Sequence, residues 1–144
     1  MRSLLAILLT LLPSLATAQT VAPGAWDVTS TVVEFSIPGV PRFLQRMARG
    51  KAKAEHKRLA AGQGVAELLA PDPKANCHVD SQSIADGRYA QGLTCPQKRG
   101  EPVRIVRTGI YDATGFTGRA TVTGTTPRGA LRIALDQRAA RVGR

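Results

Sequence analysis

The sequence predicts a mainly β or α+β fold, namely a single curved antiparallel sheet with one basic helical excursion and one disulfide. Three observations support this prediction. Several segments are rich in β-branched residues and alternate apolar with polar side chains, as half-buried strands do. Short turns containing glycine or proline separate them, which favours a meander of neighbouring strands. One segment in the first half of the chain is strongly basic instead, and the chain contains only two cysteines.

The N-terminal sequence MRSLLAILLTLLPSLATA has the organisation of a cleaved secretory signal peptide over residues 1–18. Arg2 supplies the positive start, an apolar run follows, and A-T-A at 16–18 fits the cleavage site. The alternative is a retained membrane helix, but the apolar run is shorter than the roughly 20 residues that span a bilayer, and a proline interrupts it. We therefore expect export to the periplasm, one mature domain over residues 19–144, and no integral membrane segment after cleavage.

Residues 25–35, AWDVTSTVVEF, predict the first strand, because they are rich in β-branched residues and proline-glycine turns bound them on both sides. Trp26 and Val28 point to one face, whereas Val33 and Phe35 point to the other. This switch of faces indicates a bulge, or a strand that leaves one layer for another.

Residues 42–60 form the most basic segment, and the approximate helical spacing of their apolar residues predicts a helix. Gly50 weakens that prediction by about 1 kcal/mol relative to alanine. The sequence VAELLA at 65–70 predicts one further helical turn. The basic side chains, which are opposed only by Glu55, form a candidate anion-binding surface: Arg42, Arg46, Arg49, Lys51, Lys53, Lys57 and Arg58.

The remainder of the chain predicts strands joined by tight turns. The expected strands are 77–80, 89–95, 103–111, 116–124 and 130–137, and the last three form an antiparallel meander. Asp112 and Gly115 fit a type I turn followed by a left-handed glycine. Gly109 and Gly118 lie inside strands, where glycine marks a bulge or the close approach of another group.

We expect Cys77 and Cys95 to face each other across the first of these hairpins, which predicts a disulfide in an exported protein. The alternatives are a metal pair or a redox site. The spacing contains no C-x-x-C motif, and His78 alone does not complete a zinc site.

Two groups of short motifs occur together in this chain. The first is PGAWDVTSTVVEFSIPGVP at residues 23–41. The second consists of Cys77, Gly87 and Cys95, then Gly109, Tyr111, Phe116, Thr117 and Gly118, then Ala140, Arg141 and Gly143. In order and spacing they resemble domain-of-unknown-function family 3617, whose members are small exported proteins of Gram-negative bacteria. The resemblance covers most of residues 23–143 and implies export, one domain and a mostly antiparallel sheet. It implies no activity, because none is assigned to the family.

The chain departs from the family pattern in two respects. Many members carry one cysteine before the central pair and another at the extreme C-terminus. Both are absent here, as is expected if these two normally pair with each other. Residues 42–58 are also richer in lysine and arginine than the methionine- and proline-rich segment often found there.

No catalytic group stands out. His56 lies in the basic run and His78 beside a cysteine, and both fit exposed imidazoles; the acids are scattered, and no G-x-S-x-G, P-loop or H-E-x-x-H motif is present. We expect no catalytic residue, no metal site and no cofactor. The formal net charge of +10 favours anionic partners. Nucleic acid is not expected, because the chain is exported and few aromatic residues interleave with the charge.

Three function hypotheses remain. The first is a non-catalytic exported protein that binds anionic envelope components, such as phospholipid head groups, lipopolysaccharide phosphates or an acidic polymer, through the basic segment. The alternative interpretation of that segment is a solvated helix without a binding role. The second is a carrier for a small apolar ligand, bound on the concave face of the sheet near Trp26, Tyr111 and Phe116. The third is an enzyme of unknown class.

Overall fold

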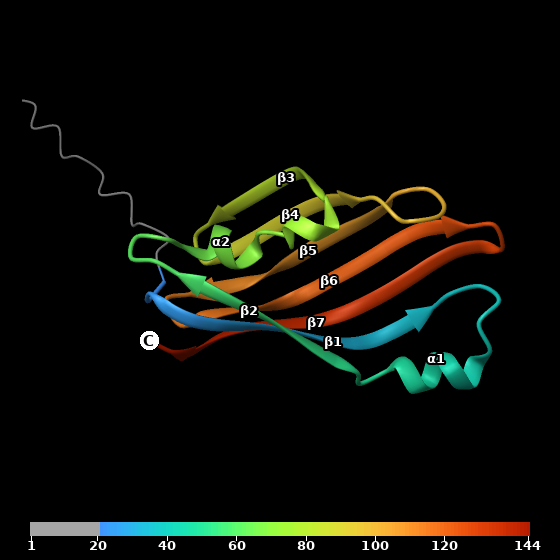
Figure 1. Ribbon diagram of the computed structural model, residues 1–144, viewed down its shortest axis with the longest axis horizontal. Helices are drawn as coiled ribbons and strands as arrows, with labels where there is room; N and C mark the ends of the chain where they lie inside the picture. The colour runs from blue at the N-terminus through green and yellow to red at the C-terminus, as the bar shows by residue number, and fades with distance from the viewer. Residues whose placement is uncertain (1–20) are drawn as a thin grey trace, which may run out of the picture.

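The computed structural model describes residues 21–144, so the signal peptide predicted over residues 1–18 lies outside the described residues. The described chain forms one seven-stranded antiparallel sheet in the order β2-β1-β7-β6-β5-β4-β3 (Figure 1). The strands are β1 (Gly24–Ser36), β2 (Ala52–Leu59), β3 (His78–Ala85), β4 (Arg88–Cys95), β5 (Val103–Asp112), β6 (Gly115–Thr126) and β7 (Gly129–Gly143). The helices are α1 (Arg42–Ala48), α2 (Val65–Leu69) and the 3-10 turn η1 (Pro73–Ala75).

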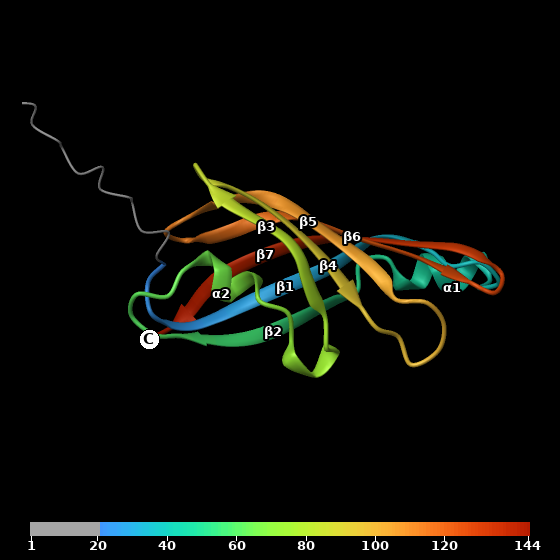
Figure 2. The same ribbon diagram turned by 90° about the horizontal axis from the view of Figure 1, so that it is seen from above.

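The predicted fold class is confirmed. Strands β3 to β7 are consecutive neighbours and make an antiparallel meander. β1 then pairs with β7 along almost its whole length, and β2 pairs with the other edge of β1. The sheet does not close on itself, because β2 and β3 are its two edges, and it is strongly twisted when seen from above (Figure 2).

The helix predicted over residues 42–60 is wrong for its second half. The helix stops at Ala48, and Ala52–Leu59 is the edge strand β2. Alanine, lysine and glutamate dominate β2 and favour helices in isolation, but the backbone of β1 offers a row of hydrogen-bonding partners that decides the local structure. The further helical turn predicted at 65–70 is confirmed as α2.

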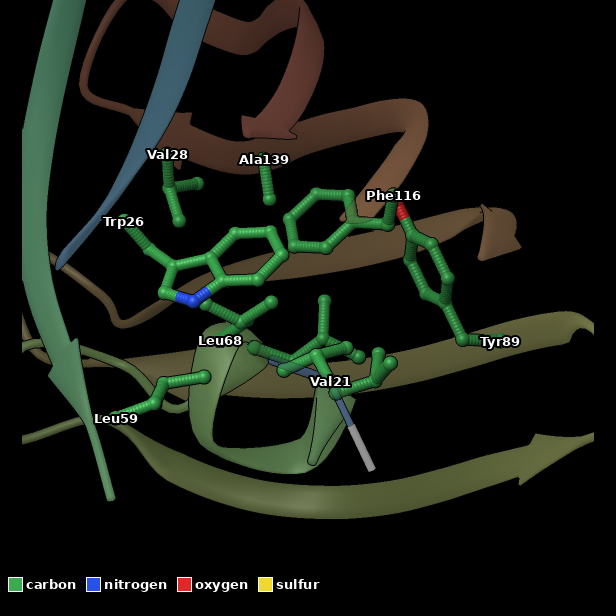
Figure 3. Close-up of a cluster of buried hydrophobic side chains, with 10 residues drawn as sticks. Val21, Trp26, Val28, Leu59, Leu68, Tyr89, Phe116 and Ala139 are labelled. Carbon is green, nitrogen blue, oxygen red and sulfur yellow. The ribbon is translucent and has the colours of Figure 1, made fainter. Parts of the chain in front are cut away.

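The core lies between the inner face of the sheet and α2, around which the sheet curves (Figure 3). Val65, Leu68 and Leu69 of α2 are fully buried, and Trp26 and Phe116 contribute the two large rings from the sheet. Burying a side chain of this kind contributes about 1.5–3 kcal/mol. Apolar packing therefore holds α2 against one half of the sheet.

Two sequence expectations about strand geometry are confirmed. The register between β1 and β7 shifts between Val32 and Glu34, which is the bulge indicated by the change of faces. Gly109 and Gly118 pair directly across β5 and β6, and a Cβ on either one would collide with the hydroxyl of Tyr89. The glycines thus mark a close approach: they make room for a tyrosine that packs edge-to-face on Phe116, with ring centroids 5.2 Å apart.

The predicted disulfide and the predicted turn are also present. Cys77 and Cys95 are bonded, with their Cα atoms 4.1 Å apart, and tie the start of β3 to the end of β4. In the β5–β6 turn, the carboxylate of Asp112 accepts the backbone N–H of Thr114 at 2.8 Å, and Gly115 follows with a φ of +137°. The hydrogen bond from the Thr114 hydroxyl, together with this backbone hydrogen bond, holds the pKa of Asp112 below its usual value.

Candidate functional site

A pocket with a volume of about 230 Å³ lies on the inner face of the sheet, beside α2. Its floor is apolar and comes from the central strands, with Ile105, Ala120, Val122 and Leu135 on β5, β6 and β7. One wall is the segment from Leu68 to Ala75, which includes η1. The pocket is neither an enclosed cavity nor a flat surface, so a ligand could enter it without unfolding of α2.

A row of hydrogen-bonded polar side chains crosses this apolar floor. Gln137 Nε2 donates to Ser30 Oγ at 2.9 Å, and Arg107 Nε donates to Gln137 Oε1 at 2.8 Å. Arg107 Nη1 donates to Gln91 Oε1 at 3.1 Å, and Gln91 Nε2 donates to Gln82 Oε1 at 2.8 Å. The row therefore runs from β1 to β3, with Arg107 at its centre.

Arg107 is the unusual member of the row, because its side chain is a buried cation with an exposed fraction of only 7% for the residue. It forms no ion pair within residues 21–144. Burial lowers its pKa below the ordinary arginine value, an effect that Tyr89 and the Glu55 carboxylate oppose only in part. Buried charges are costly and are normally paired. Within the described chain, the Arg107 cation therefore lacks the anionic partner that a buried charge ordinarily has.

One nitrogen of the Arg107 guanidinium has no partner among the described residues. Nε and Nη1 are occupied by Gln137, Gln91 and the carbonyl of Leu69, but Nη2 has no hydrogen-bond partner in the described part of the chain. Tyr89 Oη is the only side-chain polar atom of the described residues that is both sealed from solvent and unpartnered. Nη2 is therefore unpartnered among these residues without being sealed from solvent, and Arg107 is one of the residues that line the pocket.

Arg107 also has a structural role, which it shares with Lys57. Arg107 Nη1 donates to the Leu69 carbonyl at 2.9 Å, and Lys57 Nζ donates to the carbonyls of Glu67 and Ala70 at the same helix end. Cations at a helix C-terminus satisfy its last carbonyls and interact favourably with the helix dipole. Burial is the main cause that lowers the pKa of Lys57, and the neighbouring Glu55 carboxylate acts in the opposite direction.

The seven basic residues predicted to form one binding surface are divided in the structure between the α1 region and β2. Arg42, Arg46, Arg49 and Lys51 lie on or next to α1 and are exposed. The other three lie along β2: Lys53 borders the inner pocket, Lys57 holds the end of α2, and Arg58 donates to the carbonyl of Arg144 at the opposite end of the sheet. The seven cations therefore do not share one face.

The three residues proposed for an apolar pocket lie in or against the core. Trp26 and Phe116 are at most 2% exposed. The Trp26 indole donates to the Ala22 carbonyl at 2.9 Å. Tyr111 packs against them and, with Phe116, borders a second, more polar pocket of about 270 Å³ at the β5–β6 turn. Trp26 does not line that pocket, and the pocket with the apolar floor lies further along the inner face.

Both histidines are exposed and contact aspartates. His56 Nδ1 lies 2.5 Å from Asp27, and His78 Nδ1 lies 2.9 Å from Asp80. Asp80 also accepts the hydroxyl of Thr94, and these two hydrogen bonds hold the pKa of Asp80 below its usual value. Within residues 21–144 no cluster of three or more potential metal ligands occurs. Over the same residues, no helix has the length and apolar character needed to cross a bilayer.

The polar row was missed in the sequence, although the strand pattern contains a signal for it. Arg107 alternates in phase with Val103, Ile105 and Tyr111, which occupy the inner face of β5. Gln137 is likewise in phase with Leu135 on β7. Polar residues in phase with the apolar side of two strands predict a polar site inside the fold.

The fold and site define a small open-sheet protein with a partly polar pocket on its curved inner face. The family model described as Protein of unknown function (DUF3617) matches residues 21–144, so the chain belongs to that family. Neither a curated protein nor a solved structure matches the chain.

Proposed function

We propose that this protein is an exported, non-catalytic binding protein that carries a small, largely apolar ligand in the inner pocket. The observation that carries the proposal is the pocket of about 230 Å³ beside α2, with an apolar floor crossed by a polar row. Ligand sites in proteins combine such apolar walls with a few well-placed polar groups that fix the ligand's orientation. The periplasm is the proposed compartment, on the strength of the N-terminal sequence and the disulfide.

The volume limits the size of the ligand. At roughly 30 Å³ for each water-sized group, the pocket has room for about eight non-hydrogen atoms. A longer apolar chain would extend over Val103 and Ile133, which lie on the same inner face and are only partly buried. The proposal therefore concerns a short amphiphile or one end of a longer one.

Native mass spectrometry of protein recovered from a bacterial periplasm tests this function. We expect a bound small molecule with the wild type and its loss with Val122→Phe, because Val122 lines the pocket and a phenyl ring would fill it. Thr123→Phe is the matched control, since it places the same ring on the exposed face of the same strand. An adduct of equal mass and abundance in Val122→Phe, or no adduct with the wild type, would contradict the proposal.

A second candidate function is attachment to anionic membrane surfaces through α1. Three large apolar side chains of this helix are exposed: Phe43 by 61%, Leu44 by 43% and Met47 by 62%. They are accompanied by Arg42, Arg46, Arg49 and Lys51, and no acidic residue occurs between Glu34 and Glu55. Apolar side chains flanked by cations are the combination that binds at the interface of anionic bilayers.

The position of α1 is consistent with this second function. It lies at the end of the sheet opposite the C-terminus and away from α2 (Figure 1). The side chain of Gln45 donates to the carbonyls of Ile37 and Val40 and so anchors the helix to the preceding turn. The apolar residues are therefore held outward without a role in the core.

A further inference from the structure

We propose that the inner pocket selects a monoanionic ligand, specifically a carboxylate on an apolar chain, and that Arg107 binds the carboxylate through Nη2. This inference rests on the proposed carrier function and names the chemical class of its ligand. The geometry that supports it is a buried guanidinium with two partnered nitrogens and one unpartnered nitrogen at the pocket.

The arrangement around Arg107 holds the unpartnered nitrogen in place. Gln137 fixes Nε at 2.8 Å, Gln91 and the Leu69 carbonyl fix Nη1, and the Cζ atom lies 5.8 Å from the centre of the Phe116 ring. These partners are neutral, so they orient the guanidinium without cancelling its charge. A preorganised guanidinium binds a carboxylate through short, charge-assisted hydrogen bonds.

The charges at the edge of the pocket favour one negative charge on the ligand over two. Glu55 and Asp72 line the pocket with Lys53 and Arg107, so the lining carries no excess positive charge. Glu55 pairs with Lys57 at 3.5 Å, and Asp72 accepts the backbone N–H of Lys74 at 2.9 Å. Arg107 is thus the buried cation available to a ligand, while the two carboxylates would repel a dianion such as a phosphate monoester.

The apolar chain of the ligand has a defined place next to Arg107. Ala120 pairs with Arg107 across β5 and β6 and lines the same pocket. Val122 and Leu135 continue the apolar floor away from α2. A ligand with its carboxylate at Arg107 would therefore extend its chain along the open half of the inner face.

Calorimetric titration with sodium octanoate, 1-octanol and octyl phosphate tests this inference. The three probes share one chain and differ in their head group. We expect octanoate to bind the wild-type protein about ten-fold or more tightly than 1-octanol, since hydrogen bonds to charged groups have that magnitude. We expect octyl phosphate to bind no more tightly than octanoate.

The ratio of the octanoate and 1-octanol affinities separates ligand binding from the structural role of Arg107. Arg107→Gln should bring the ratio close to one, whereas Arg107→Lys, which keeps the charge, should retain part of the preference. Lys57→Gln is the matched control: it removes the same charge and also releases the end of α2, but Lys57 does not line the pocket. This control also frees the Glu55 carboxylate at the edge of the pocket, so it should lower the ratio, but much less than Arg107→Gln does.

Each contrary result has a distinct meaning. Equal binding of octanoate and 1-octanol by the wild type would overturn the carboxylate inference and leave the carrier function standing. Failure of all three probes to bind would contradict both. Loss of the preference in Lys57→Gln to the same extent as in Arg107→Gln, or a ten-fold preference for octyl phosphate over octanoate, would also overturn the inference. Should Arg107→Gln fail to fold, the wild-type ratio and Arg107→Lys decide the matter.

Discussion

Gly115 lies directly against the carbonyl oxygen of Ala139, so that a Cβ at position 115 would collide with the backbone of β7. Its φ of +137° is also one that residues with side chains rarely adopt. Position 115, the first residue of β6, therefore requires glycine for two separate reasons. A Cβ at position 115 would also lie only 3.2 Å from the ring of Trp26 in the core.

Gly115→Val should destabilise the fold through both effects. Backbone strain alone costs about 1–3 kcal/mol, and the collision with β7 adds to it. Urea unfolding followed by Trp26 fluorescence would measure the loss. Thr114→Val provides a neighbouring control with the same new side chain at an exposed position. A free energy of unfolding unchanged in Gly115→Val would contradict the described turn.

The Cys77–Cys95 disulfide should stabilise the protein by about 2–5 kcal/mol, as is usual for native disulfides in small exported domains. It joins the start of the edge strand β3 to the end of its neighbour β4. Urea unfolding of the double variant Cys77→Ser/Cys95→Ser, compared with the wild type with and without reductant, would measure this. Recovery of both thiols in free form from periplasmic protein, by non-reducing peptide mapping, would argue against the bond.

Tyr89→Phe should not destabilise the fold and should stabilise it by about 1 kcal/mol. The Tyr89 hydroxyl is sealed from solvent and has no partner among the described residues, and a buried hydroxyl without a hydrogen bond costs about 1–3 kcal/mol. Burial also raises the pKa of this hydroxyl, because the phenolate would be poorly solvated. Phenylalanine keeps the edge-to-face contact with Phe116. A destabilisation larger than about 1 kcal/mol in thermal or urea unfolding would show that the hydroxyl has a partner in solution.

The strands whose sequences alternate were predictable, and so was their meander. In β6 and β7, for example, Ala120 and Leu131 fall on the buried side where the pattern places them. The disulfide was predictable because two cysteines flank one hairpin. The pairing of β1 with β7 was not, because the partners lie at opposite ends of the chain and no turn connects them.

Strand β2 shows why local propensity failed. Its residues alternate between small or charged side chains and carry no apolar stripe, with Leu59 as its only buried residue. Charged residues, lysine above all, are characteristic of edge strands, where they discourage pairing with another chain. Without knowledge that β2 is an edge, the same residues favour a helix.

The inner pocket was only partly predictable. A ligand site on the concave face was hypothesised, but around the aromatic residues, of which Trp26 and Phe116 pack in the core. A site at Arg107 was not predicted from the sequence, because arginine on a strand is ordinarily exposed. Only the three-dimensional arrangement, in which Gln91 and Gln137 come from strands far apart in the sequence, brings its partners together.

The last prediction is that the exposed helix α1 binds anionic membranes. The variant Arg42→Gln/Arg46→Gln/Arg49→Gln/Lys51→Gln should reduce sedimentation with phosphatidylglycerol-containing vesicles strongly. Each basic residue near an anionic surface contributes about 1 kcal/mol, and the attraction fades within a Debye length of about 8 Å at physiological salt. Binding by the wild type should therefore also weaken as salt is raised. Phe43→Ser/Met47→Ser should weaken the salt-resistant part of the binding, since these side chains supply the apolar contact.

A second quadruple variant separates a local surface from net charge. Arg58, Arg88, Arg138 and Arg144 are exposed and lie away from α1, so their replacement by glutamine changes the net charge equally. If α1 is the binding surface, this control should retain most of the vesicle binding, because the cations next to the exposed Phe43 and Met47 are intact. Melting temperatures should stay close to the wild-type value in both variants, since none of the α1 cations forms an ion pair within residues 21–144. Equal loss of binding in the two variants would assign the effect to overall charge, and absence of wild-type binding at low salt would remove α1 as a membrane-binding surface.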